Sequence, residues 1–166
     1  MMGVAPVASA SGAADYYSSK DNYYFLGNLE SAWLGKGAQG LGLEGQVDLD
    51  TFTDVLHGKL PDGTELGKDV QGGHVHRPGH DLTFSAPKSV SILILAGNDR
   101  ALLAAHNEAV RDAVEQVEQL VSARITREGV TRIVPTGKLV AAAFTHDPTR
   151  NLHPGVHPHV LVASAT

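Results

Sequence analysis

A long amphipathic helix is the sequence feature that most constrains the fold of this chain. Apolar residues recur at three- and four-residue spacing from Leu102 to Val121, and Asn98 or Asp99 can cap the start of the helix. Four short β-prone segments follow it: 123–126, 130–134, 139–145 and 157–163. Glu128-Gly129 is suited to a hairpin turn between the first two of them. One long helix and several short strands predict an α+β fold with a mainly antiparallel sheet.

A further strand is expected ahead of the long helix, within residues 81–97. Apolar side chains alternate at Leu82 and Phe84, the pattern breaks at Pro87, and it resumes as the apolar run Val90–Leu95. This pattern is typical of a buried strand interrupted by a bend. We expect this strand at the centre of the sheet.

The first half of the chain is rich in glycine between Gly27 and Gly73, and we expect much of it to be loop. Asp48–Leu56 is its one helical candidate. Ahead of this segment, residues 13–26 carry apolar or aromatic side chains at a spacing of seven, which is two helical turns. The spacing predicts a helix that carries all four tyrosines of the chain on two neighbouring stripes: Tyr16 and Tyr23, and Tyr17 and Tyr24.

Composition excludes several classes of protein. With 166 residues and 42% hydrophobic residues, the chain suffices for one globular domain, and no linker divides it. Thirteen basic against 18 acidic side chains give a formal charge of −5, so any contact with DNA must be local or assisted by a metal ion. Without cysteine, and without a secretory signal or a long apolar run, the chain is expected to be soluble and cytoplasmic.

A histidine cluster suggests a metal site. His157 and His159 should project from one face of a strand, about 7 Å apart along the chain. His146 ends the preceding strand, and antiparallel pairing can bring it to the same face. Three neutral imidazoles can hold a divalent cation and leave positions open for substrate, as catalytic metal sites do. Other histidines are rival ligands or surface residues: His74, His76, His80 and His153. Exposed histidines at a sheet edge are the alternative interpretation of the whole cluster.

The tyrosine cluster also has two interpretations. Paired tyrosines on a helix are commonly core or interface residues, because a phenol buries much area and needs one hydrogen bond. Next to a metal site, a tyrosine oxygen can instead attack a phosphodiester. Tyrosines together with a three-histidine metal site therefore suggest DNA nicking.

Four segments, in order and in spacing, resemble the conjugative relaxases of the TraI/TrwC (MobF) type. They are YYSSKDNYY at 16–24, WLGKGAQGLGL at 33–43, HRPGHDLTFSAPKSVS at 76–91 and HPH at 157–159. The resemblance implies an HUH-type endonuclease with an antiparallel palm sheet flanked by helices. It implies that the chain is the N-terminal part of a relaxase domain over residues 1–166, with no helicase domain.

The resemblance also implies the site residues and the reaction. Tyr16 maps to the principal nucleophile, Tyr23 to the tyrosine of a second strand transfer, and Tyr17 to a supporting group. The metal ligands map to His146, His157 and His159, holding one divalent ion, Mg²⁺ or Mn²⁺. Asp81 maps next to the metal, where it can accept a hydrogen bond from a ligand imidazole. The substrate is single-stranded DNA at a plasmid origin of transfer in bacterial conjugation, with relaxosome accessory proteins as partners.

Departures from the family pattern leave alternatives open. Pro158, in the middle of the HPH segment, suggests an edge or bulged strand. Lys36, Arg77 and Lys88 lie in or beside the motifs and can contact phosphates or remain solvated. The alternative functions are a catalytically incomplete DNA-binding fragment, an HUH endonuclease of rolling-circle replication, and a metal hydrolase unrelated to DNA.

Overall fold

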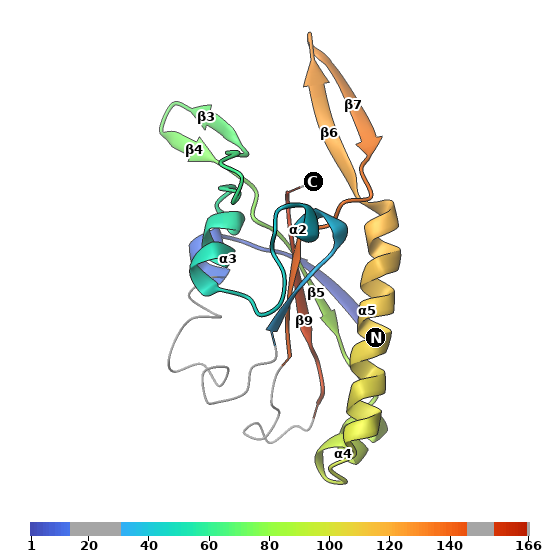
Figure 1. Cartoon of the computed structure of the whole chain (residues 1–166). Coiled ribbons are helices and arrows are strands. Elements are labelled where there is room, and N and C mark those ends of the chain that lie inside the picture. Colours follow the sequence, from blue (N-terminus) through green and yellow to red (C-terminus); the bar gives the residue numbers. More distant parts are fainter. Residues whose placement is uncertain (14–30, 146–154, 166) are drawn as a thin grey trace.

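The structure is a computed structural model that describes residues 1–13, 31–145 and 155–165 (Figure 1). A five-stranded antiparallel sheet forms its centre, in the order β1-β5-β9-β8-β2. Its strands are β1 (Met2–Pro6), β5 (Gly79–Phe84), β9 (His159–Ala163), β8 (Ala141–Phe144) and β2 (Ser31–Leu34). The predicted α+β fold with an antiparallel sheet is confirmed. The central strand is β9, however, and β5 lies one place from the centre.

Helices cover both faces of this sheet. They are α2 (Lys36–Gly40), α3 (Leu49–Leu56), α4 (Lys88–Leu95) and α5 (Arg100–Leu120). On one face, Val110 and Val114 of α5 belong to a buried cluster with Val160 of the central strand. On the opposite face, Phe52 of α3 stacks edge-on against Phe144 with ring centroids 5.2 Å apart. The apolar side chains of the sheet thus divide between two cores, one on each side.

Two of the three predicted helices are confirmed, and the third, over residues 13–26, lies outside the described residues except for its first position. The side chain of Asp99 accepts a hydrogen bond from the backbone N–H of Leu102 at 2.9 Å, which caps α5. Asp48 caps α3 in the same way, accepting from Thr51 at 2.9 Å. Within the described part of the chain, no helix is both long and apolar enough to cross a membrane.

The apolar run Val90–Leu95 forms helix α4, so the prediction of a strand there is wrong. Its buried residues are Ser91 and Ile94, three positions apart, whereas Ile92 and Leu93 are exposed. That is helical spacing. The β-branched residues of the run favour a strand, but a six-residue apolar run without alternation fits either structure. Pro87 is compatible with the helix because it lies at the N-cap of α4. The backbone N–H groups at the start of a helix have no partner within it, so a proline there costs no hydrogen bond.

The glycine-rich segment contains more regular structure than expected. Besides α3, it holds β2, α2 and a hairpin of β3 (Lys68–Val70) with β4 (Gly73–Val75). At Gly35, φ is +98° and an added Cβ would collide with the carbonyl of Leu139, so glycine is required where β2 passes into α2. These elements are short, and β2 pairs with β8 from far along the chain, so local patterns did not mark them.

A second hairpin, of β6 (Ser122–Arg127) with β7 (Val130–Pro135), follows α5 and projects from the body of the molecule (Figure 1). Glu128 and Gly129 form its turn, both with positive φ, as predicted. The two strands pair with each other and lie outside the central sheet.

Pro158 lies directly ahead of the central strand β9, so the prediction of an edge or bulged strand there is wrong. Its carbonyl accepts a hydrogen bond from the backbone N–H of Phe84 at 3.0 Å. Because the proline precedes the first ladder residue of β9, its missing N–H does not interrupt the strand.

Candidate functional site

The imidazoles of His157 and His159 lie together at the start of the central strand. Their ring centroids are 5.8 Å apart and the ring planes meet at 70°. His159 is the first residue of β9, and His157 lies two residues earlier. The prediction that both project from one face is confirmed, although only His159 belongs to the strand as formed.

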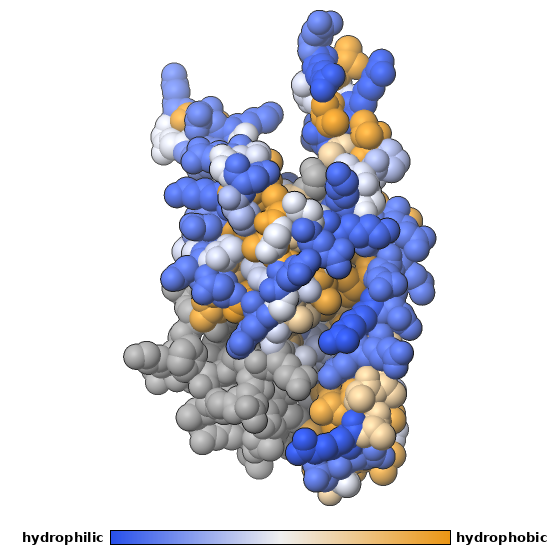
Figure 2. Space-filling model, viewed as in Figure 1, coloured by the Kyte–Doolittle hydropathy of each residue, from blue (hydrophilic) through white to orange (hydrophobic). Residues whose placement is uncertain are grey.

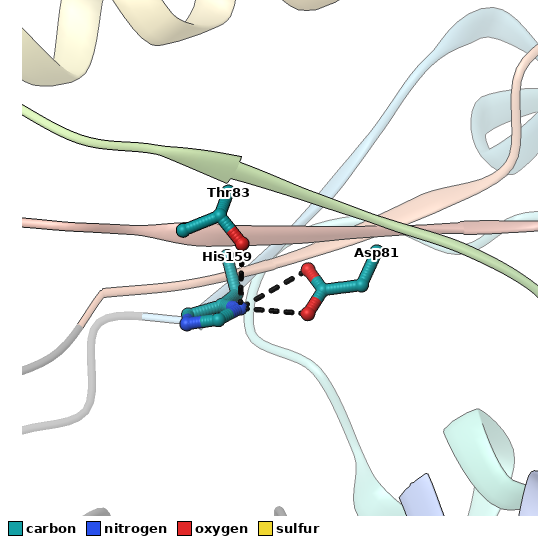
Figure 3. Close-up of polar contacts among 3 residues, drawn as sticks. All are labelled: Asp81, Thr83 and His159. Carbon is teal, nitrogen blue, oxygen red and sulfur yellow. Dashed lines mark hydrogen bonds and ion pairs between the residues drawn. The ribbon is translucent and has the colours of Figure 1, made fainter. Parts of the chain in front are cut away.

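Asp81 reaches His159 from the neighbouring strand β5 (Figure 3). The β5–β9 register pairs Thr83 with His159, so Asp81, two residues before Thr83, lies on the same face and diagonal to the histidine. His159 Nδ1 lies 2.8 Å from Asp81 Oδ2 and 3.0 Å from Oδ1. The hydrogen bond from an imidazole to Asp81 that the resemblance implies is therefore present. Their side chains are 15% and 24% exposed, so the pair is half-buried.

Hydrogen bonding selects the tautomer of both rings. A carboxylate only accepts, so His159 Nδ1 carries the proton in its bond to Asp81. His157 Nδ1 lies 2.7 Å from the carbonyl oxygen of Gly155, which again requires the proton on Nδ1. In the neutral form, each ring then has its lone pair on Nε2.

This donor set fits a divalent cation. Metal-binding histidines commonly donate their second ring N–H to a carboxylate or a backbone carbonyl. Here His159 donates to the carboxylate of Asp81 and His157 donates to the carbonyl of Gly155. His146, the third ligand in the sequence prediction, lies outside the described residues, as do Tyr16, Tyr17, Tyr23 and Tyr24. Among the residues that the structure describes, no three His, Cys, Asp or Glu side chains gather closely enough to hold a metal ion. Phe144, the last residue of β8, pairs with His159, so β8 ends beside the histidine pair.

Thr83 is a site residue that the sequence does not mark by itself. Its Oγ1 lies 3.4 Å from His159 Nδ1 (Figure 3). Its position two residues after Asp81 in a strand is the signal that finds it, because such residues share a face.

Two of the rival histidines, His74 and His76, lie in a different part of the molecule. His74 and His76 line a groove at the base of the β3–β4 hairpin, beside the end of α3. The hydrogen bond from His74 to Asp69, at 3.0 Å, raises the pKa of His74, and a bond to the carbonyl of Leu66 adds to this. Burial lowers the pKa of His76. His80 is exposed on β5, and His153 lies outside the described residues.

The basic residues of the motifs are exposed. Lys36 begins α2, Lys88 begins α4, and Arg77 lies just ahead of β5. Each side chain is accessible to a phosphate, so the structure is consistent with the contacts considered for them.

An antiparallel sheet that presents paired histidines backed by a carboxylate is the fold and candidate site of a relaxase, and the chain belongs to the TrwC relaxase family, which matches residues 10–166. Over all 166 residues it is 51% identical to the multifunctional conjugation protein TraI of Escherichia coli (strain K12). The chain spans 10% of the length of that relative.

Solved structures of conjugative relaxase TrwC share the fold. The metal-bound complex of TrwC with oriT DNA matches with a TM-score of 0.81 and 37% identity, over 98% of this chain and 56% of that one. TrwC with a 27-mer DNA comprising the recognition hairpin and the cleavage site matches with a TM-score of 0.79 and 34% identity, over 98% and 55% of the two chains. The resemblance to relaxases inferred from the four motifs is confirmed.

Proposed function

We propose that this chain is the N-terminal part of a conjugative relaxase domain that nicks one DNA strand at a plasmid origin of transfer. The observation that carries the proposal is the His157–His159 pair with Asp81 on His159 Nδ1, on a sheet that matches a relaxase known in complex with oriT DNA. Bacterial cytoplasm and relaxosome accessory proteins are the setting that this activity implies.

The nucleophile in this proposal is Tyr16. Its phenolic oxygen attacks the scissile phosphorus, the bond from phosphorus to the 3′-oxygen breaks, and the tyrosine keeps the 5′-phosphate. The free 3′-hydroxyl takes up the proton that the phenol, with an ordinary pKa of about 10, has lost. Because the phosphotyrosine ester retains the energy of the broken bond, rejoining needs no ATP. Tyr23 would serve a second strand transfer, with Tyr17 in support.

His146, His157 and His159 are the proposed ligands of one divalent cation, Mg²⁺ or Mn²⁺. When bound, the cation would neutralise charge on the nonbridging phosphate oxygens during in-line displacement. Neutral imidazoles would preserve its full positive charge. Asp81 and the carbonyl of Gly155 keep the protons of His159 and His157 on Nδ1, so that both rings present the Nε2 lone pair.

The β6–β7 hairpin offers a local surface for DNA in an otherwise acidic chain. It carries three exposed arginines: Arg124, Arg127 and Arg132. Figure 2 shows apolar residues interspersed with hydrophilic ones on this hairpin, and Ile133 is 75% exposed. A two-stranded ribbon fits the major groove of duplex DNA. We expect Arg127→Gln with Arg132→Gln to reduce the salt dependence of binding to a DNA hairpin by about two counterions, measured by fluorescence anisotropy.

A covalent-capture experiment tests the proposed reaction. The protein is incubated with a randomised single-stranded DNA library and Mg²⁺ or Mn²⁺, followed by denaturing electrophoresis and mass spectrometry of any protein–DNA adduct. An EDTA-sensitive adduct on Tyr16, lost in Tyr16→Phe, supports the proposal and identifies the target sequence. An adduct on Tyr23 alone would reassign the nucleophile. Binding without an adduct, by folded protein with metal bound, would favour the catalytically incomplete DNA-binding fragment.

Metal binding is tested separately by calorimetric titration. We expect His157→Ala to weaken binding of Mn²⁺, with His80→Ala on the exposed part of β5 as the matched control. An unchanged affinity in His157→Ala would overturn the ligand assignment.

A rolling-circle replication endonuclease is the alternative function with the same chemistry. The tyrosines precede the HPH segment in this chain, and that order favours the relaxase.

A further inference from the structure

Val156, the residue immediately ahead of His157, is held at both of its backbone polar groups. Its N–H donates to Ser91 Oγ at 3.1 Å, and its carbonyl accepts from the N–H of Ala86 at 2.9 Å. Its side chain is 2% exposed. One partner lies between β5 and α4 and the other within α4, so Val156 is fixed by a distant part of the sequence.

Ser91 is notable for its burial. It lies in the middle of α4, in an apolar run, and is fully buried, one of two buried polar or charged residues among those that the structure describes. A buried hydroxyl is costly unless it is hydrogen-bonded. Its own backbone N–H is satisfied within the helix by the carbonyl of Pro87, at 2.9 Å. Its Oγ is directed to the Val156 N–H, an irregular backbone group that has no strand partner.

The same part of the sequence also holds the residue on the other side of His157. The N–H of Phe84 donates to the Pro158 carbonyl at 3.0 Å. His157 therefore lies between two residues whose backbones are tied to residues 84–91. Its ring bonds back to the Gly155 carbonyl at 2.7 Å, so the direction of the ring depends on the path of the chain through Val156.

We propose that Ser91 is a positioning residue for His157. Asp81 orients His159 by a direct side-chain bond, whereas Ser91 orients His157 through the backbone of Val156. The inference rests on the proposed function, in which His157 is a ligand of a divalent cation. In this arrangement the segment 81–91 controls both imidazoles, one from β5 and the other from α4.

Ser91→Ala tests the inference, because it removes the acceptor and leaves the Val156 N–H buried without a partner. Ser89→Ala is the matched control, since Ser89 lies exposed on the same helix. Two measurements are made on the full 166-residue chain. Mn²⁺ binding is followed by the electron paramagnetic resonance signal of the free ion. The tautomers of His157 and His159 are read from ¹⁵N chemical shifts of the metal-free protein.

We expect Ser91→Ala to weaken Mn²⁺ binding about tenfold or more, the range typical of groups that orient metal ligands. In the metal-free protein, His157 should lose its fixed Nδ1–H tautomer while His159, held by Asp81, keeps it. Ser89→Ala should leave both measurements as in the wild type. Ser91→Thr, which retains the hydroxyl, should restore the His157 tautomer, and Ser91→Cys replaces Ser91→Ala if the alanine variant does not fold.

Three results overturn the inference: an unchanged His157 tautomer, unchanged Mn²⁺ binding, or equal disturbance of both histidines, which would indicate general loosening of the fold. Failure of the proposed function looks different. A wild-type protein that binds no Mn²⁺ contradicts the metal centre, and the tautomer of His157 in Ser91→Ala then decides the positioning role by itself.

Discussion

Replacing Glu118 by alanine should cost more stability than any other single change to a charged side chain of α5. Glu118 is 5% exposed, and its Oε1 accepts two backbone hydrogen bonds, from Lys36 at 2.6 Å and from Leu139 at 2.9 Å. Lys36 is the first residue of α2, and Leu139 lies just ahead of β8. The Leu139 carbonyl in turn accepts from Ala38 at 3.1 Å. One carboxylate thus joins α5, α2 and the approach to β8.

The size of the effect follows from the two N–H groups that Glu118→Ala leaves without an acceptor. A buried donor without a partner costs about 1–3 kcal/mol. Water entering the space of the lost side chain offsets part of this, and so does relief from burying a carboxylate. We expect a net loss of about 3 kcal/mol, which for a chain of this length lowers Tm by about 6–12 °C. Glu118→Gln, which keeps the acceptor oxygen without the charge, should lose about 1 kcal/mol.

Urea unfolding measures this loss, with the fluorescence of Trp33 as the probe. Trp33 is the single tryptophan, it is 9% exposed, and it lies in the core cluster that includes Ala38 of α2. Glu115→Ala is the control, because Glu115 is exposed on the same helix. If Glu118→Ala and Glu115→Ala lowered the free energy of unfolding by the same amount within about 0.5 kcal/mol, the two hydrogen bonds to Glu118 would contribute no net stability and the reasoning would be refuted.

Three further predictions concern the site and the two hairpins. Asp81→Asn should weaken Mn²⁺ binding by about 10–100-fold and release the tautomer of His159, seen in ¹⁵N shifts; an unchanged affinity would contradict the role of Asp81. Glu128→Asn should raise stability by several tenths of a kcal/mol or more in urea unfolding, because Glu128 has φ of +49° in a turn that favours asparagine; a loss of stability would contradict this. The pKa of His74 is raised in the fold by Asp69, so its contribution is present below about pH 6.5 and lost as pH rises through the folded pKa. His74→Gln should therefore destabilise the chain at about pH 5.5 and not at about pH 9, and equal effects at both would refute the cationic contact.

Local signals and distant contacts explain which elements the sequence predicts. Helix α5 was predictable because its cap at Asp99 and its apolar stripe are both encoded within the helix itself. Helix α4 was not, because a short run of β-branched residues fits a strand or a helix equally well until its neighbours are known. The β2 strand pairs with β8, more than a hundred residues away, and no pattern within Ser31–Leu34 specifies that partner.

The candidate site likewise has features that the local sequence predicts and features that depend on distant contacts. That His157 and His159 share a face follows from alternation over three residues. The contact between Asp81 and His159 depends on the β5–β9 register, which joins residues 78 positions apart, and only the family resemblance pointed to it. Ser91 carries no signal of its own, because a serine within an apolar run is also what an ordinary amphipathic helix contains.

These contacts make the paired histidines and the segment 81–91 one structural unit. Segment 81–91 supplies a carboxylate to His159, an N–H to the Pro158 carbonyl, and both backbone partners of Val156. Each of these groups of the histidine segment takes its partner from residues 81–91, which meets the need of buried polar groups for hydrogen bonds. The two imidazoles are therefore held in place only when β9 has paired with β5 and α4 has formed. The arrangement of the two histidines on which the proposed metal binding depends is thus a product of long-range folding. It should be lost together with the segment 81–91 rather than independently of it.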